Sequence, residues 1–356
     1  MIILGIETSC DETAAAVLKV ERCKFNLLSN IISSQVKTHA KYGGIVPEVA
    51  ARMQMKMIMP ILNQALKLAS SKSQNTISKN SIDYIAVTQG PGLITSLMVG
   101  VETAKTLSYI LNKPLIPVNH LAAHLLVNCI NNKIKFPAVG LIVSGGHTIL
   151  VLITSSKNGL KYKIIGETQD DAVGEAFDKV AKILNLGYPG GPIISKLAIN
   201  GDKNKFNLPR PMIQQQNFNF SFSGLKTAVL YLTQKYKNIK TKKHSKSDYE
   251  LRNLCASFQQ ACIDVLISKT LRAIKEFKPK SFLLGGGVAA NPELRQQLQK
   301  KINIKFPKVK IFMPELKFTG DNAVMVAVAG YFKINNNKKI NTKKFKADPN
   351  INNSLS

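Results

Sequence analysis

The chain has 356 residues, of which 45% are hydrophobic and 20% charged, so it is long and apolar enough for two globular domains. Its net charge of +28 favours phosphate-rich partners such as nucleic acid, although heavy use of Lys, Asn and Ile, as in AT-rich genomes, explains the charge equally well. Because there is no run of roughly 18 uncharged apolar residues and no signal-peptide pattern, we expect a protein without a membrane span. The five cysteines form no CxxC pair, which suits reduced thiols in the cytoplasm better than a disulfide framework.

The first part of the chain predicts three strands followed by alternating helices and strands. The segments "IILGIETS", "TAAAVLKV" and "FNLLSNIISSQ" are short, apolar and separated by polar turns, which is typical of a β-meander. A helix is predicted over residues 46–68, and a Ser/Lys/Asn-rich linker follows it. Then come the strand "IDYIAVTQ", a Gly-Pro-Gly turn, a helix over 95–111 and the strand "PLIPV".

The same order of elements then starts again. "PAVGLIVSGGHTILVLIT" predicts two strands joined by a Gly-Gly turn, and "KYKIIGET" predicts a third. After them we predict a helix at 172–184, an irregular segment at 187–223, a helix at 250–277, the strand "SFLLGGG", a helix after Pro292, the strand "KIFMP" and a helix at 321–332. Because three strands, a helix, a strand, a helix and a strand occur twice, the sequence predicts a duplicated α/β domain.

Two Lys-rich segments interrupt this pattern. Residues 235–246 contain six Lys and no acid, and residues 333–346 have a similar composition. We interpret both as exposed loop or tail, and the alternative is electrostatic contact with a nucleic-acid backbone.

Glycine-bearing turns follow several of the predicted strands. They are "TQGPG", "VSGGHT", "YPGGP" and "LGGGVAAN". Glycine lets backbone N–H groups approach a phosphate or an adenosine closely. None of these turns is a Walker A motif or the GxGxxG of a dinucleotide site. Together they favour a nucleotide-binding cleft between two domains.

The stretch "GIETSCDET" crowds hydroxyls and carboxylates after the first strand. Its simplest interpretation is a polar hairpin. The alternative is that these groups orient a phosphate or a metal-bound phosphate.

Two of the five histidines, His120 and His124, lie four residues apart in "VNHLAAHLL". If this run is helical, both imidazoles project from one face within reach of one metal ion. The metalloprotease motif HExxH requires Glu after the first His, but Leu121 stands there. A metal needs a third ligand, for which Asp321 in "TGDN" is the best candidate. The alternatives are two packing or surface histidines and a helix N-cap at Asp321.

Eight stretches occur in order over about residues 1–335: "GIETSCDET", "GGIVPEVAAR", "GPGL", "VNHLAAH", "LIVSGGHT", "DDAVGEAFDKVAKILNLGYPGGP", "FSFSGLKTAV" and "GGGVAAN". In these motifs and their spacing the sequence resembles the TsaD (Gcp/YgjD) family, the tRNA N6-adenosine threonylcarbamoyltransferases. It departs from the family pattern His-His-x-x-Gly-His at Asn119 and Ala123, and from Cys-Thr-Asp-Asn at Thr319 and Gly320.

The resemblance implies the ASKHA fold of actin, sugar kinases and heat-shock chaperones, in which two duplicated RNase H-like α/β domains enclose a cleft. We place the N-terminal subdomain at residues 1–116 and the C-terminal subdomain at 117–321, with an insert at about 187–247. The last helix, about 322–335, is expected to pack back on the N-terminal subdomain, and 336–356 form a Lys/Asn-rich tail.

The resemblance also implies a reaction. Threonylcarbamoyl-AMP binds in the cleft, and the N6 amine of the adenosine beside the anticodon, in tRNAs reading ANN codons, attacks the carbamoyl carbon and expels AMP. His120, His124 and Asp321 would hold one divalent metal, Fe²⁺ or Zn²⁺, which acts as a Lewis acid. The alternatives are an ATPase or small-molecule kinase of the same fold and a non-enzymatic scaffold.

Further residues follow from the motifs. The resemblance implies that the substrate is bound by Ile142, Val143, Ser144, Gly145, Gly146, Asp178, Gly191 and Asn291. Ser9, Asp11 and Glu12 face the same cleft in the family and are candidate catalytic residues for proton handling. The implied partners are tRNA, a TsaB-like paralogue that forms a heterodimer, and a TsaE-like P-loop ATPase.

Overall fold

The computed structural model describes residues 1–72, 81–157, 159–235, 246–334 and 345–351. Much of the two Lys-rich segments predicted to be exposed, 235–246 and 333–346, lies outside these ranges. No helix within the described ranges combines the length and apolar character needed to cross a membrane.

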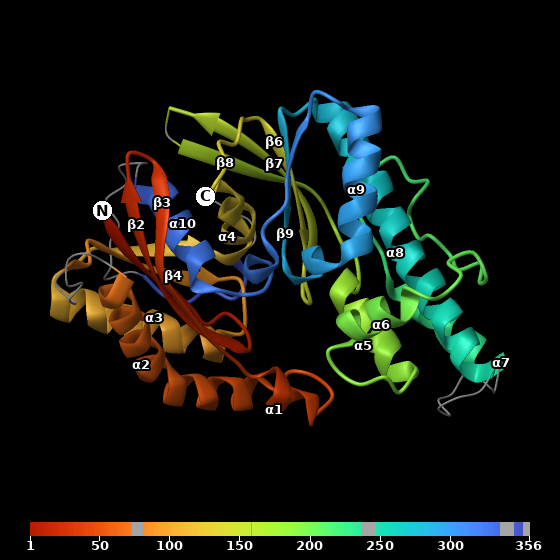
Figure 1. The fold of residues 1–356 in the computed structure, drawn as a ribbon, viewed down its shortest axis with the longest axis horizontal. Coiled ribbons are helices and arrows are strands. Elements are labelled where there is room, and N and C mark those ends of the chain that lie inside the picture. The colour runs from red at the N-terminus through yellow and green to blue at the C-terminus, as the bar shows by residue number, and fades with distance from the viewer. Residues whose placement is uncertain (73–80, 158, 236–245, 335–344, 352–356) are drawn as a thin grey trace.

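The N-terminal half contains a five-stranded mixed sheet. β1 (Ile2–Glu7), β2 (Glu12–Glu21) and β3 (Lys24–Ser34) are antiparallel neighbours, and β4 (Tyr84–Gly90) and β5 (Leu115–Asn119) extend the sheet parallel to β1. The strand order is β3-β2-β1-β4-β5. The helices of this half are α1 (Val36–Ala40), α2 (Pro47–Lys72) and α3 (Ile94–Leu111), which lie below the sheet in Figure 1.

The C-terminal half repeats this arrangement. Its strands are β6 (Ala138–Val143), β7 (Thr148–Ser156), β8 (Gly159–Glu167), β9 (Ser281–Gly285) and β10 (Lys310–Phe312), in the order β10-β9-β6-β7-β8. In each sheet the first three strands form a meander and two later strands add in parallel beside the first. The predicted duplicated α/β fold is therefore confirmed.

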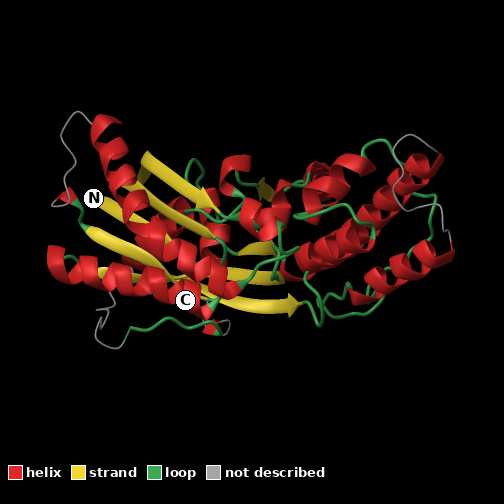
Figure 2. Cartoon of the chain, turned by 90° about the horizontal axis from the view of Figure 1, so that it is seen from below, coloured by secondary structure: helices red, strands yellow, loops and turns green. Residues whose placement is uncertain are grey.

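The helices of the C-terminal half cover its sheet and extend away from the N-terminal half (Figure 1). They are α5 (Val173–Ile183), α6 (Gly190–Ala198), α7 (Ser223–Lys235), α8 (Lys246–Phe277) and α9 (Pro292–Lys305). In the view from below, helices lie on both sides of the strands (Figure 2). Most of the apolar side chains of this half form one core that joins the sheet to α5, α6 and α8.

One prediction for this half was wrong. The segment 187–223 was expected to be irregular, but it contains α6, which begins within the run Gly190-Gly191-Pro192. A proline in the first turn of a helix lacks only an N–H group that has no intrahelical partner there, so it does not break the helix. The glycines and the proline therefore mark the start of a helix.

Two further helices connect the halves. α4 (His120–Leu126) follows β5 directly, and the 3-10 turn Val127–Cys129 continues from it. α10 (Ala323–Ile334) comes after the last strand and packs against β1, β2 and α4. It is buried on nearly all sides, because its sequence is almost entirely apolar. α10 and α4 thus bring two distant parts of the chain together beside the end of β1.

Candidate functional site

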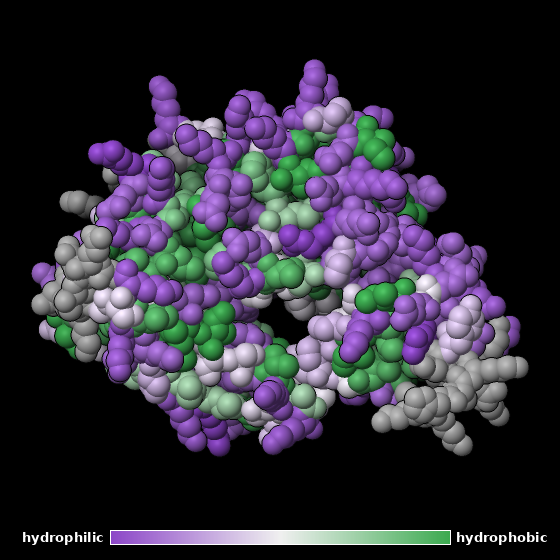
Figure 3. Space-filling model, viewed as in Figure 1, coloured by the Kyte–Doolittle hydropathy of each residue, from purple (hydrophilic) through white to green (hydrophobic). Residues whose placement is uncertain are grey.

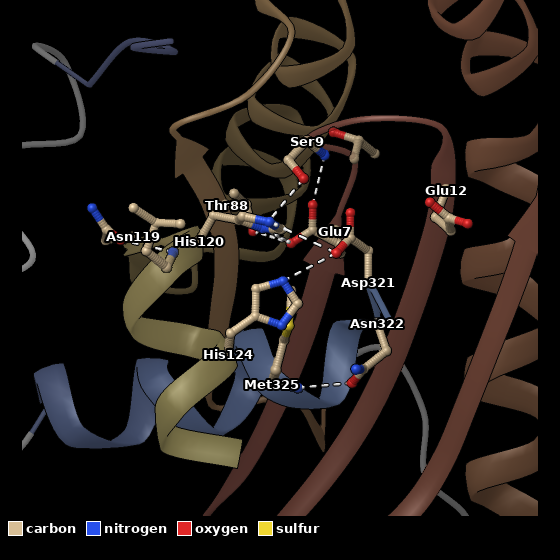
Figure 4. Close-up of polar contacts among 12 residues, drawn as sticks. Glu7, Ser9, Glu12, Thr88, Asn119, His120, His124, Asp321, Asn322 and Met325 are labelled. Atoms are coloured by element: carbon tan, nitrogen blue, oxygen red, sulfur yellow. Dashed lines mark hydrogen bonds and ion pairs between the residues drawn. The ribbon is translucent and has the colours of Figure 1, made fainter. Parts of the chain in front are cut away.

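The two histidines of the HxxxH motif lie on one face of α4. The Asn119 side chain caps this helix, since its Oδ1 accepts hydrogen bonds from the backbone N of Leu121 at 2.9 Å and of Ala122 at 3.1 Å. The His120 and His124 rings are edge-to-face with centroids 4.6 Å apart, and both side chains are buried (Figure 4). The helix therefore presents two imidazoles at a common point.

Asp321 reaches the same point from the start of α10. Its Oδ1 lies 3.1 Å from His124 Nε2 and 3.7 Å from His120 Nε2 (Figure 4). Asp321 does not provide the helix cap, because Asn322 Oδ1 accepts the bond from the Met325 backbone N at 3.0 Å. The Asp321 carboxylate is thus left to face the histidines.

This cluster fits a divalent metal ion. One ligand atom from each of His120, His124 and Asp321 can be chosen so that all lie within 4.8 Å of one another. Both ring nitrogens of His124 are buried, and among the described residues neither makes a hydrogen bond of good geometry, although Nε2 is at ion-pair distance from Asp321. Two imidazoles and one carboxylate form a donor set that suits zinc or iron.

Glu7, the last residue of β1, contacts Nδ1 of His120, whereas Asp321 lies near Nε2 of the same ring. Its carboxylate is fully buried, and Oε2 lies 3.3 Å from His120 Nδ1 and accepts a 2.6 Å bond from Thr88 Oγ1. Oε1 accepts a 2.6 Å bond from the Ser9 backbone N. Histidine ligands commonly donate their second N–H to a carboxylate, which fixes the ring and its tautomer. Sequence reasoning missed this role, for which the only signal is an acid that ends a buried strand.

The charges of the cluster shift the pKa values of its members. Burial lowers the pKa of His120, but the carboxylates of Asp321 and Glu7 outweigh it and raise the value to about 9. Burial raises the pKa of Asp321, but His120 and His124 outweigh it and lower the value to about 2. The carboxylates of the cluster therefore stabilise positive charge at His120.

A third histidine, His147, lies near the cluster in the turn between β6 and β7. Burial, followed by the positive charges of His120 and His124, lowers the pKa of His147 to about 4. His147 is therefore neutral at pH 7. The sequence placed it only within the "VSGGHT" motif and gave it no role.

The predicted catalytic residues Ser9 and Asp11 lie in the turn between β1 and β2, and Glu12 is the first residue of β2. Ser9 is buried, and its Oγ lies 3.2 Å from His120 Nδ1. Asp11 is also buried. The pKa of Glu12 is raised well above its usual range by burial and then by the charges of Asp321 and Asp11. The turn thus shares the electrostatic environment of the cluster.

The strand end "IVSGG" has an open backbone at its two glycines. The Ile142 and Val143 side chains are buried in β6, so they hold the strand in the core. At Ser144 the chain turns, with its N donating to the His147 carbonyl at 2.8 Å. Added Cβ atoms at Gly145 and Gly146 would meet no atom within 4 Å, so this backbone faces open space.

The remaining predicted substrate residues belong to α5, α6 and α9. Asp178 Oδ1 accepts a 2.7 Å bond from the Gly190 backbone N at the start of α6, and a Cβ at Gly191 would meet no atom within 4 Å. Asn291 caps α9, with Oδ1 accepting from the Leu294 N at 3.0 Å and Nδ2 donating to Gln259 Oε1 at 2.7 Å. The Asn291 amide is therefore already hydrogen-bonded within the protein. The molecule is hollowed between its two halves (Figure 3).

The fold is shared with solved structures of low sequence identity. Full-length HypF in a phosphate- and nucleotide-bound form aligns with a TM-score of 0.57 at 12% identity, over 94% of this chain and 55% of that chain. Component A of the Acidaminococcus fermentans (R)-2-hydroxyglutaryl-CoA dehydratase aligns with a TM-score of 0.50 at 15% identity, over 94% and 99%. These likenesses concern the fold alone, and they agree with the predicted ASKHA-type fold of two duplicated α/β domains.

Sequence comparison is more specific. The model of the family TsaD, tRNA N6-adenosine threonylcarbamoyltransferase, matches residues 26–328. A protein of that name from Thermosipho africanus is 48% identical over 93% of this chain and 94% of its own length, and one from Persephonella marina is 47% identical over 93% and 90%. The chain therefore belongs to the tRNA N6-adenosine threonylcarbamoyltransferase family, which is a family of transferases.

Proposed function

We propose that this protein transfers the threonylcarbamoyl group from threonylcarbamoyl-AMP to N6 of the adenosine beside the anticodon, in tRNAs reading ANN codons. The observation that carries the proposal is the cluster of the buried His120 and His124 with the partly buried Asp321, in a chain of this family. In the reaction the N6 amine attacks the carbamoyl carbon, the bond from that carbon to the phosphate oxygen breaks, and AMP leaves.

The cluster would hold one divalent ion, Fe²⁺ or Zn²⁺, which supplies Lewis-acid polarisation of the substrate. Glu7 fixes the His120 ring, and the cap at Asn119 fixes α4. The two imidazoles and the carboxylate are thus positioned before the substrate arrives, which avoids the cost of ordering them during the reaction.

The substrate would lie between the cluster and the second half of the molecule. The open backbone at Gly145 and Gly146 suits the adenylate phosphate, since glycine allows close approach of N–H groups. The Asp178 carboxylate, which accepts bonds from the backbone of Gly190 and Gly191, would also bind the ribose hydroxyls. Gly191 and Asn291 complete the nucleoside side of the proposed site.

The attacking amine must lose a proton. Its lone pair is delocalised into adenine, so the reaction needs an activated acyl donor and an acceptor for that proton. Burial, followed by the charges of Asp321 and Asp11, raises the pKa of Glu12 well above its usual range, so its carboxylate is a stronger base than an ordinary one. We propose Glu12 as the proton acceptor and Ser9 and Asp11 as groups that orient it and the substrate.

The proposed domain division falls within β5 (Leu115–Asn119), the last strand of the first sheet. Residues 1–116 form the N-terminal subdomain and 117–321 the C-terminal one, with an insert at 187–247. The packing of α10 on β1 and β2 supports assigning residues 322–335 to the N-terminal subdomain.

The proposed partners besides tRNA are a TsaB-like paralogue and a TsaE-like P-loop ATPase. The side chains of Met55, Met59, Ile94 and Met98 are exposed on α2 and α3, which pack against each other. Such an apolar face on adjacent helices suits a protein interface, and we assign it to the paralogue. The ATPase rests on the family resemblance alone.

Metal content and transfer to tRNA, measured together, test the proposal. With the adenylate supplied, the wild type should contain about one metal per chain and modify tRNA, and His120→Ala should lose both. His39→Ala is the matched control, because His39 is a buried histidine that bonds Gln35 outside the cluster. Full transfer activity in metal-free His120→Ala would contradict the metal's role.

A further inference from the structure

The C-terminal segment 345–351 is docked on the N-terminal half. The Phe345 side chain is only 5% exposed and belongs to the core under β4 and β5. The Asp348 backbone N donates to the Gln89 carbonyl at 2.9 Å, and Gln89 Nε2 donates to the Lys346 carbonyl at 3.0 Å. These contacts fix the segment beside the end of β4.

The end of the segment reaches the helix that bears the histidines. Asn119 Nδ2 donates to the Ile351 carbonyl at 3.1 Å, while Oδ1 of the same side chain caps α4. One amide therefore ties the C-terminal segment to the first turn of the helix that carries His120 and His124.

Gly90 makes the docking possible. In the sheet Gly90 is paired with Asn119, so the two positions that contact the segment are adjacent. A Cβ at Gly90 would overlap the Asp348 carbonyl oxygen and lie 3.0 Å from an Ile351 methyl. Only glycine allows the segment to lie this close to β4.

A second chain of contacts links the end of β4 to His120. Thr88, next to Gln89 in β4, donates to Glu7 Oε2 at 2.6 Å, and that oxygen lies 3.3 Å from His120 Nδ1. The segment thus contacts two parts of the protein that orient the cluster. One is Asn119, which caps α4, and the other is the end of β4, where Thr88 bonds Glu7.

We propose that residues 345–351 are a positioning strap for the metal ligands. By fixing Asn119 and the end of β4, the strap holds α4 and Glu7 in the arrangement that binds the ion. The inference rests on the proposed metal centre, but it concerns residues outside the proposed ligand and substrate-binding sets.

Truncation gives the first test. Zn²⁺ affinity is measured by chelator competition, and the visible spectrum of bound Co²⁺ reports the ligand geometry. Removal of residues 345–356 should weaken binding about 10–100-fold, as expected for lost support of metal ligands, and change the Co²⁺ spectrum. Removal of only 352–356 is the matched control and should change neither.

Point variants separate the strap from general stability. Asn119→Asp keeps an N-cap acceptor but cannot donate to Ile351, and Gly90→Ala excludes the segment. Each should weaken Zn²⁺ binding in the full chain and have no further effect in the chain ending at 344. This non-additivity distinguishes the strap from a general loss of stability, even where the truncated chain is less stable.

The outcomes are distinguishable. Full-length Zn²⁺ affinity in the chain ending at 344, or equal effects of Gly90→Ala with and without the segment, would overturn the strap and leave the metal centre intact. Absence of Zn²⁺ and Co²⁺ binding in the full chain would overturn the proposed metal centre, and the strap with it.

Discussion

Glu7 is a fully buried acid whose carboxylate contacts His120, Thr88 and Ser9. A buried charge is costly unless it is paired and hydrogen-bonded. These contacts meet that requirement and keep the carboxylate behind the His120 ring. At the scale of single residues, the cluster therefore depends on a group that is not itself a candidate ligand.

Replacing Glu7 should weaken metal binding without removing a ligand. Glu7→Gln keeps the size and an acceptor oxygen, but it loses the charge that orients and polarises His120. We expect metal affinity to fall about 10–100-fold in chelator competition. The control Glu102→Gln changes an exposed acid on α3 that pairs with Lys105. Unchanged affinity in Glu7→Gln would show that its carboxylate does not support His120.

At the scale of elements, α4 is held by close packing on both sides. It contacts α10 on one side and β6 and β9 on the other. At Gly285, in β9, a Cβ would lie 2.5 Å from the His124 carbonyl oxygen. The backbone of the helix thus approaches the sheet closely at the residue that provides a ligand.

Gly285→Ala should therefore displace α4. The new methyl meets backbone rather than a flexible side chain, so we expect lower stability and weaker metal binding. Gly287→Ala is the matched control, because a Cβ there would meet nothing within 4 Å. Thermal unfolding and chelator competition measure both effects, and equal behaviour of the two variants would contradict this account of the packing.

Sequence patterns predicted the elements better than the contacts between them. The apolar runs and turn residues identified the strands of both sheets, because a buried strand needs a continuous apolar segment. The 3.6-residue period identified the face shared by His120 and His124. The start of α6 was missed, since glycine and proline more often mark irregular chain.

The tertiary contacts of the site required the structure. The sequence left open whether Asp321 is a metal ligand or the N-cap of the last helix, and the bond from the Met325 backbone N to Asn322 Oδ1 assigns the cap to Asn322. Glu7 and Ile351 lie far along the chain from the histidines they support, and no local pattern marks such pairs. Asp321 was proposed as a ligand from the resemblance and from its place before a helix.

At the scale of the whole molecule, the cluster joins distant segments. α4 follows the last strand of the first sheet, and Asp321 comes from the connection that returns the chain to that sheet. A ligand that binds only the folded state stabilises it, by about 2.7 kcal/mol at a hundredfold excess over Kd.

Metal removal should therefore lower the unfolding temperature. Chelation of the wild type is expected to reduce Tm by several degrees, and Zn²⁺ should restore it. His124→Ala should show no response to chelator or to Zn²⁺. An identical response of the wild type and His124→Ala would place the stabilising ion elsewhere.

The exposed methionines of α2 make a separate prediction about assembly. Met55 and Met59 are 61% and 47% exposed, so Met55→Lys with Met59→Lys should leave the fold intact. The charges would be buried in the proposed interface, so we expect loss of the complex with a co-expressed TsaB-like paralogue in size-exclusion chromatography. Ile199→Lys, at a 77% exposed position in the other half, is the control. A stable complex in the double variant would exclude this face.

The amount of AMP released per modified adenosine tests the central claim most directly. The protein is incubated with threonylcarbamoyl-AMP and tRNA but no ATP, and AMP and the nucleosides of the digested tRNA are quantified by mass spectrometry. We predict one AMP per N6-threonylcarbamoyladenosine, and neither product with His124→Ala. AMP release without modified adenosine, or product formation that requires ATP, would contradict threonylcarbamoyl transfer and favour an ATPase or kinase of the same fold.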